Sequence, residues 1–249
     1  MPPGYDRAAV RLLRSTAEGF DEAVADVLAD AIAERPGAVL LLATGNTPIG
    51  GFRVLARRAA EGAVDVSAVR VVQLDEYVGV PDDDRRSLYG WLEREFLTPL
   101  GIPAERVTRF DVAAPQDVAA SCRAMDAAIA GLGGLDLALL GVGPNGHLGF
   151  NEPPSPADAP TREVPLAPAS IVSNAVYWGG EDQVPRTAVT VGMAPILAAR
   201  QIALVVRGAH KRAILRQTLE GPETADVPAS LARRAARLTV VADGAALGD

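Results

Sequence analysis

The sequence contains very little cysteine, lysine and histidine. Of 249 residues, one is cysteine (Cys122), one is lysine (Lys211) and two are histidine. A single cysteine cannot form a disulfide within the chain, and no cysteine cluster or histidine pair has the spacing of transition-metal ligands. We therefore expect neither a disulfide nor a metal site.

Long apolar runs and an excess of basic side chains are also missing. The apolar stretches, such as 38–43, are much shorter than the roughly 20 residues that span a bilayer. Acidic residues outnumber basic ones by 31 to 24, which disfavours nucleic acid or an anionic membrane as a partner but allows a local site for a small anion. The N-terminus lacks the cationic and apolar segments of a secretion signal, so a cytoplasmic location is expected.

Short apolar runs alternate with segments of helical periodicity. The runs predict strands at 38–43, 69–74, 135–140, 188–191, 202–206 and 238–241, and the periodicity predicts helices at 20–34, 48–61, 87–97, 116–132 and 210–219. Uniformly apolar strands are typical of a parallel sheet that is buried on both faces. We predict an α/β fold: a three-layer α/β/α, Rossmann-like arrangement with a mostly parallel central sheet, in a single domain over residues 1–249.

A proline-rich segment interrupts this alternation. Six prolines lie between residues 153 and 168, and a Gly-Gly pair follows at 179–180. Such a composition disfavours regular structure and suits a covering loop. We expect a lid over about residues 154–184.

Small polar residues follow the predicted strand that ends at Ala43. Backbone N–H groups and hydroxyls at a helix N-terminus form a natural anion site, and proline, here Pro48, is favoured at the first helical position. A helix capped by Thr47 is the structural alternative, and it is compatible with anion binding. The candidate phosphate ligands are Thr44, Gly45, Asn46 and Thr47.

Two adjacent carboxylates, Asp75 and Glu76, follow the next predicted strand. A carboxylate at a strand end is rigidly placed to act as a general base if it lies in a cleft. Neighbouring acids are also common on ordinary surfaces, so these two residues alone do not decide between the two interpretations.

A third strand end, at 141–153, gathers Asn145, His147 and Glu152 within eight residues. A solvated turn on Asn145-Gly146 is the simple alternative. The start of this segment also matches G-x-G-x-x-G, but a dinucleotide site needs a long helix next, which the prolines at 153, 154 and 156 disfavour. An imidazole beside carboxylates instead predicts proton transfer on a small anionic metabolite without a metal.

The segments 44–48, 74–79 and 141–153 together resemble the glucosamine-6-phosphate deaminase family. The resemblance continues in the same order through 183–185, 188–192, 208–211 and 228–230, so it covers nearly the whole chain. The related 6-phosphogluconolactonases share the fold and a Gly-His loop. The Phe-Asn-Glu-Pro sequence at 150–153 and the Asp-Glu-Tyr sequence at 75–77 are similar to the deaminase branch.

This resemblance implies an enzyme, without an organic cofactor, that converts an amino-sugar phosphate such as glucosamine 6-phosphate into a ketose phosphate and ammonia. His147 would assist opening of the sugar ring, oriented by Glu152 and Asn145. Asp75 would move the C2 proton to C1. The phosphate would bind the loop at 44–47 and Lys211, and the further binding candidates are Glu76 and Gly146.

The chain departs from the family pattern at the lid. Val176 stands where an arginine that contacts the phosphate is usual, and Val164 replaces a basic residue associated with allosteric control. A histidine that usually follows the Pro-Ala-Ser segment is also absent, so allosteric activation by an N-acetylated sugar phosphate is not expected. Three residues are candidates to replace the missing cation: Arg162, Arg186 and Arg207.

Two other functions stay open at this point. The lid changes are compatible with a non-catalytic sugar-phosphate-binding protein, and the shared fold with a lactonase-type hydrolase. Members of the family occur as monomers and as larger assemblies, so a homo-oligomer is possible and the sequence does not determine it.

Overall fold

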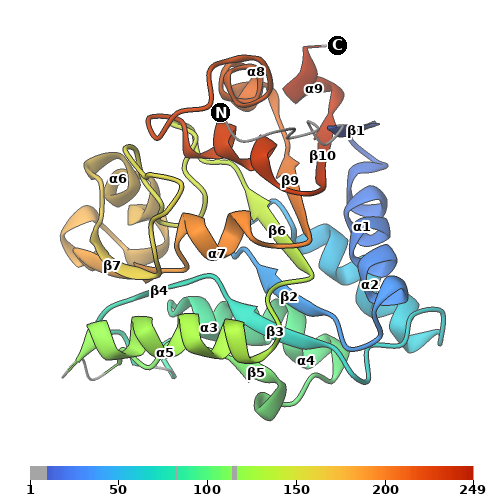
Figure 1. The fold of residues 1–249 in the computed structure, drawn as a ribbon, viewed down its shortest axis with the longest axis horizontal. Coiled ribbons are helices and arrows are strands. Elements are labelled where there is room, and N and C mark those ends of the chain that lie inside the picture. The colour runs from blue at the N-terminus through green and yellow to red at the C-terminus, as the bar shows by residue number, and fades with distance from the viewer. Residues whose placement is uncertain (1–9, 82, 114–116, 249) are drawn as a thin grey trace, which may run out of the picture.

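A seven-stranded parallel sheet forms the centre of the computed structural model, which describes residues 10–81, 83–113 and 117–248 (Figure 1). Each neighbouring pair of strands in it is parallel, which confirms the predicted α/β class. In spatial order the strands are β1 (Arg11–Ser15), β10 (Leu238–Asp243), β9 (Gln201–Val206), β6 (Leu137–Gly141), β2 (Val39–Leu42), β3 (Arg70–Gln73) and β5 (Val107–Thr108).

Helices cover both faces of this sheet. One apolar core joins one face to α1 (Phe20–Glu34), α2 (Ile49–Ala60) and a continuous segment made of α3 (Leu88–Leu92), the π-helical η1 (Glu93–Leu97) and α4 (Thr98–Leu100). A second core joins the other face to α5 (Val118–Gly131), α7 (Met193–Leu197), α8 (Arg212–Glu220) and α9 (Gly244–Leu247). The strands alternate between the two cores: Leu41 of β2 belongs to one and Leu42 to the other. The predicted helices are confirmed to within a few residues, and the predicted start at 116 lies outside the described residues.

A second, three-stranded sheet was not predicted. It is antiparallel, in the order β4 (Asp75–Tyr77), β8 (Thr187–Thr190) and β7 (Arg162–Pro165). The prediction that 188–191 belongs to the central sheet was therefore wrong. An apolar run predicts that a strand is buried, but it does not predict which strand pairs with it. Val189 packs in a main core, and Ala188 packs in the small core beneath the lid.

The lid segment is more regular than its composition suggests. Besides β7 it contains α6 (Pro168–Trp178) and the 3-10 turn η3 (Glu181–Gln183), which lie to one side of the central sheet in Figure 1. Pro168 occupies the start of α6, where proline is tolerated, and Gly179 ends that helix with φ +79°. Pro168 and Gly179, which indicated a loop in the sequence, thus mark the two ends of α6.

The order of strands creates a crevice between β2 and β6. These strands are neighbours, but the chain continues from β2 to β3 and β5 in one direction and from β6 to β9 and β10 in the other. The loops that follow them therefore diverge, and open α/β sheets bind ligands at such a switch point.

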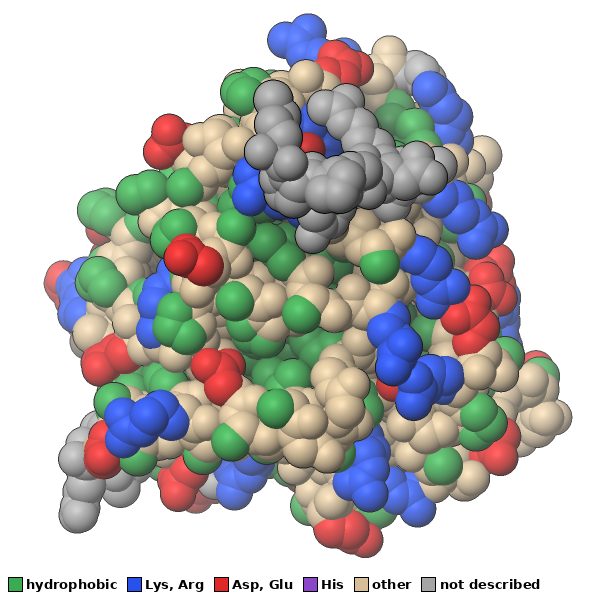
Figure 2. Space-filling view, in the orientation of Figure 1, with side chains coloured by type: hydrophobic (Ala, Val, Ile, Leu, Met, Phe, Trp, Pro, Cys, Tyr) green, Lys and Arg blue, Asp and Glu red, His purple; other side chains and the backbone are tan. Residues whose placement is uncertain are grey.

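No helix among the described residues is long and apolar enough to cross a membrane. On the face of the molecule in Figure 2, side chains of both charges lie around the periphery.

Candidate active site

A cavity of about 500 Å³ lies at the carboxyl edge of the sheet, where the loops after β2, β6 and β9 meet. The structure brings most of the predicted site residues to its wall, and α6 of the lid also contributes. The predicted residues that line it are Thr44, Gly45, Asn46, Thr47, Asp75, Asn145, His147 and Lys211. Three others, Glu76, Gly146 and Glu152, do not line it.

Asp75 begins β4 and is 5 % exposed. Its Oδ1 is buried and accepts no hydrogen bond from any described residue. Gly149, with φ +58°, passes so close that a Cβ there would lie 3.1 Å from Asp75 Oδ2. Burial, with the negative charge of Glu76 as a second cause, raises the pKa of Asp75 to about 8. The carboxyl group therefore stands at the cavity with an unpaired oxygen and a pKa suited to proton transfer at neutral pH.

Glu76 points away from the cavity, since successive residues of a strand face opposite sides. Its carboxylate accepts hydrogen bonds from the Gln73 amide and from the backbone N–H groups of Tyr77, Leu88 and Tyr89, at 2.8–2.9 Å. Burial raises the pKa of Glu76, and these hydrogen bonds oppose that rise. The contacts fix the first turn of α3 to β4, which is a structural role, so the structure does not bring Glu76 to a ligand.

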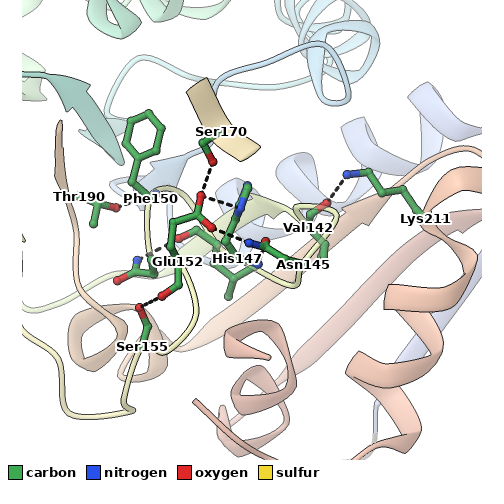
Figure 3. A network of polar contacts seen from close by, with 11 residues as sticks. Val142, Asn145, His147, Phe150, Glu152, Ser155, Ser170, Thr190 and Lys211 are labelled. Carbon is green, nitrogen blue, oxygen red and sulfur yellow. Dashed lines mark hydrogen bonds and ion pairs between the residues drawn. The ribbon is translucent and has the colours of Figure 1, made fainter. Parts of the chain in front are cut away.

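His147 and Glu152 form a pair in the loop after β6 (Figure 3). The His147 Nδ1 lies 3.0 Å from Glu152 Oε1, although no described atom makes a well-aligned hydrogen bond with that nitrogen. Glu152 also accepts hydrogen bonds from the Asn145 amide, at 2.7 Å, and from the Ser170 hydroxyl. Burial acts to raise the pKa of Glu152, but His147, Ser170 and Asn145 outweigh it and lower the pKa to about 2. The carboxylate therefore stays ionised and orients the imidazole.

Two glycines of the G-x-G-x-x-G match, Gly143 and Gly146, shape the loop that contains His147. A Cβ on Gly143 would overlap the His147 ring, so only glycine allows the ring to lie over the backbone there. Gly146, with φ +85°, completes the turn, and its carbonyl accepts a hydrogen bond from Ala229 N at 2.8 Å. No helix follows the loop before β7. The geometry is that of a histidine-presenting turn and not of a dinucleotide fingerprint.

Lys211 lines the same cavity as Asp75. It ends a 3-10 turn, η4 (Ala209–Lys211), and its Nζ donates a hydrogen bond to Val142 O at 2.7 Å. Burial lowers the pKa of Lys211, and no carboxylate among the described residues is recorded as its ion-pair partner. The loop 44–47, which precedes α2, lines the same cavity. An ammonium ion and a helix N-terminus thus face one pocket, as a phosphate site requires.

The lid contributes residues that sequence reasoning missed. Ser170, in the first turn of α6, contacts Glu152, and the Tyr177 hydroxyl accepts a hydrogen bond from the Asn46 amide at 3.0 Å. Ser173, Asn174 and His210 also line the cavity. The helical spacing of 170, 173, 174 and 177 places them on one face, a signal that is visible once α6 is recognised as a helix. Val176 is 78 % exposed and does not line the cavity.

The described residues include no evident set of metal ligands and no reactive thiol. Among the described residues, no group of three or more His, Cys, Asp or Glu side chains is placed to hold a metal ion. Cys122 is buried in α5, and burial raises the pKa of its thiol to about 11, which suppresses the thiolate.

Comparison with known sequences decides the family. Residues 13–241 match the glucosamine-6-phosphate isomerases/6-phosphogluconolactonase family. The chain belongs to this family. A glucosamine-6-phosphate deaminase of Streptomyces coelicolor is 40 % identical over 92 % of this chain and 88 % of that protein, and one of a Geobacillus species is 38 % identical over 92 % and 91 %.

Solved structures of the family have the same fold. A monomeric glucosamine-6-phosphate deaminase superposes with a TM-score of 0.92 at 33 % identity, over 96 % of this chain and 99 % of the other. The 6-phosphogluconolactonase of Thermotoga maritima superposes with a TM-score of 0.74 at 18 % identity, over 94 % and 100 % of the two chains. At that identity, the likeness to the lactonase concerns the fold alone.

Proposed function

We propose that this protein is a glucosamine-6-phosphate deaminase, which converts glucosamine 6-phosphate and water into fructose 6-phosphate and ammonia. The observation that carries the proposal is the unpaired, buried carboxyl of Asp75, which shares one cavity with the His147–Glu152 pair. Family relatives that cover about nine tenths of the chain at close to 40 % identity have this activity in their names.

The first step is opening of the sugar ring, for which His147 is the acid–base group. The ionised Glu152 holds the imidazole from the Nδ1 side, so Nε2 is the nitrogen available for a proton transfer to the ring oxygen. Asn145 secures Glu152 and also accepts a hydrogen bond from the His147 backbone N–H at 3.2 Å. His147 is thus oriented by Glu152 at its side chain and by Asn145 at its backbone.

The second step is transfer of a proton from C2 to C1, for which Asp75 is the base. Its ionised form takes the C2 proton and gives an enolamine; the same proton is then delivered to C1, which gives a ketimine. Water adds to the ketimine carbon and ammonia leaves. A pKa of about 8 makes both the uptake and the return of the proton accessible near neutral pH.

The test is ammonia release from glucosamine, galactosamine and mannosamine, each with and without the 6-phosphate, together with detection of the ketose product. We expect turnover of glucosamine 6-phosphate with equal amounts of fructose 6-phosphate and ammonia. Hydrolysis of 6-phosphogluconolactone instead would support a lactonase. Thermal stabilisation by the amino-sugar phosphates without any product would support a binding protein.

Three further expectations belong to this proposal. We infer that residues 1–249 act as one unit whose lid spans about 154–184, and that the enzyme works in the cytoplasm. Assembly into a homo-oligomer is an open alternative to a monomer, and light scattering distinguishes them; the solved relative at 33 % identity is described as monomeric.

A further inference from the structure

We propose that Arg207 binds the substrate phosphate together with Lys211 and so replaces the cation that is missing at Val176. The inference rests on the proposed function, because it names the residue that makes the site selective for a phosphorylated sugar. It is carried by the position of the guanidinium, by its unused hydrogen-bond donors and by the absence of other arginines from the cavity wall among the described residues.

The two cations come from one short connection. Arg207 is the first residue after β9, and the chain then turns through Gly208, with φ +95°, into the η4 turn that ends at Lys211. Both residues line the cavity. Their spacing of four residues across a single turn lets them approach one anion from two sides.

The Arg207 guanidinium makes several contacts, but these use only some of its N–H donors. Its Nη2 donates to Ala17 O at 3.0 Å, its Nη1 lies 3.3 Å from Asp21 Oδ1, and it lies over the Phe20 ring at 5.3 Å from the centroid. An arginine has five N–H donors, of which these two contacts use two. Its side chain is 42 % exposed, so it is not enclosed by these contacts.

The same contacts place Arg207 near the N-terminus of α2. Its partner Asp21 packs against the first turn of α2, where a Cβ on Gly50 would overlap the Asp21 carboxylate. The helix α2 is the one that follows the loop 44–47. Arg207 therefore lies near the N-terminus of α2, and Arg207, Lys211 and the loop 44–47 border one cavity, where a phosphate near a charge of −2 would meet two cations, one of them already paired with Asp21.

The other candidate arginines are placed elsewhere. Arg162 donates to Asn151 Oδ1 at 2.8 Å and to Ser155 Oγ at 3.0 Å, and neither Arg162 nor Arg186 lines the cavity. His210 also lines the cavity, but an imidazole lacks the planar fork of N–H donors with which a guanidinium binds phosphate.

The test compares Arg207→Met with Arg207→Lys and with a matched control, Arg212→Met. Arg212 is a neighbouring arginine whose guanidinium donates to Ala245 O and does not line the cavity. The measurements are kcat and KM for glucosamine 6-phosphate, and the inhibition constant of inorganic phosphate.

We expect Arg207→Met to raise KM and the phosphate inhibition constant about 10- to 100-fold, the effect of one lost charged hydrogen bond, with kcat changed less than about 3-fold. Arg207→Lys keeps the charge but loses the planar fork, so its increase should be smaller. Arg212→Met should stay within about 2-fold of the wild type.

A different pattern overturns the proposal. If Arg207→Met lowers the melting temperature but leaves KM and the phosphate inhibition constant within about 2-fold of the wild type, Arg207 stabilises the packing of α1 on the sheet and does not bind the phosphate. If the wild type does not convert glucosamine 6-phosphate, the proposed function fails, and calorimetric binding of inorganic phosphate to the wild type and the three variants then decides the role of Arg207 separately. Equal affinity in the wild type and Arg207→Met contradicts that role, and weaker binding by Arg207→Met supports it.

Discussion

Asp75 is a buried carboxylic acid and Glu152 a partly buried one in the same site, and their pKa values shift in opposite directions. Burial raises the pKa of Asp75 to about 8, whereas burial of Glu152 is outweighed by its partners and its pKa falls to about 2. The difference lies in the neighbours: no described group donates to Asp75 Oδ1, while Glu152 has the Asn145 amide, the Ser170 hydroxyl and the His147 ring.

This contrast assigns the two roles. A carboxyl group with a raised pKa exchanges a proton near neutral pH. A carboxylate that stays ionised orients a neighbouring side chain and stabilises its positive charge. At the Asp75 position of β4 no described group donates to Oδ1, whereas the turn after β6 and the first turn of α6 supply donors to Glu152.

Removal of the proton carrier should have the largest effect. We expect Asp75→Asn to lower kcat about 10³-fold or more, because the amide cannot take the C2 proton. Ammonia release measured in a coupled assay checks this. Asp30→Asn, an exposed change on α1, is the matched control and should retain full activity. Undiminished turnover by Asp75→Asn would remove Asp75 from the chemistry.

Loss of the orienting charge should cost less. Glu152→Gln keeps the size of the side chain but removes the negative charge beside His147 Nδ1, and we expect kcat to fall about 10- to 100-fold with a small change in KM. Steady-state kinetics over pH 6–9 provides the measurement. A loss as large as that of Asp75→Asn would contradict a merely orienting role.

The raised pKa of Asp75 also predicts a cost in stability. The unfolded chain releases this proton near pH 4 and the folded protein only near pH 8, so the wild type loses stability as pH rises through that interval. Asp75→Asn removes the penalty, and we expect it to stabilise the protein by about 1–3 kcal/mol at pH 8 and by much less at pH 4.5. Denaturant unfolding at both pH values tests the sign. A destabilised Asp75→Asn at pH 8 would contradict the desolvated carboxyl.

The smallest effect is expected from the lid contact. Ser170→Ala removes one donor from Glu152, so the pKa of Glu152 should rise toward its ordinary value and kcat should fall about 2- to 5-fold, the effect of about 1 kcal/mol. Val172→Ala, an exposed change on the same helix, is the matched control, because Val172 does not line the cavity. Equal behaviour of the two variants would show that the Ser170 hydroxyl does not influence the pair.

Much of the fold was accessible from the sequence because buried parallel strands are nearly uniform apolar runs. The runs at 38–43, 135–140 and 202–206 correspond to β2, β6 and β9, and the loops after them line the cavity. Strand β1 was missed since Arg11 and Arg14 interrupt its apolar pattern at the sheet edge. The helices α7 and α9, of five and four residues, are too short to show a period.

The sequence predicted the candidate acid–base groups and the contacts of Glu152 and Asn145 around His147, but not the contacts from the lid. Asp75 and His147 are recognisable because polar groups at strand ends converge at one edge of a parallel sheet. Sequence adjacency suggested that Glu76 would share the site with Asp75, but strand alternation turns it to the opposite side. Ser170 was hidden because the lid composition predicted no helix.

The most direct test of this contrast is a titration of the two carboxyl groups by NMR, with ¹³C-labelled Asp and Glu carboxyls assigned by comparison with Asp75→Asn and Glu152→Gln. We predict that the Asp75 signal titrates near pH 8 and that the Glu152 signal keeps the shift of an ionised carboxylate down to about pH 3. Titration of both groups near pH 4 would contradict the division of roles between the two acids.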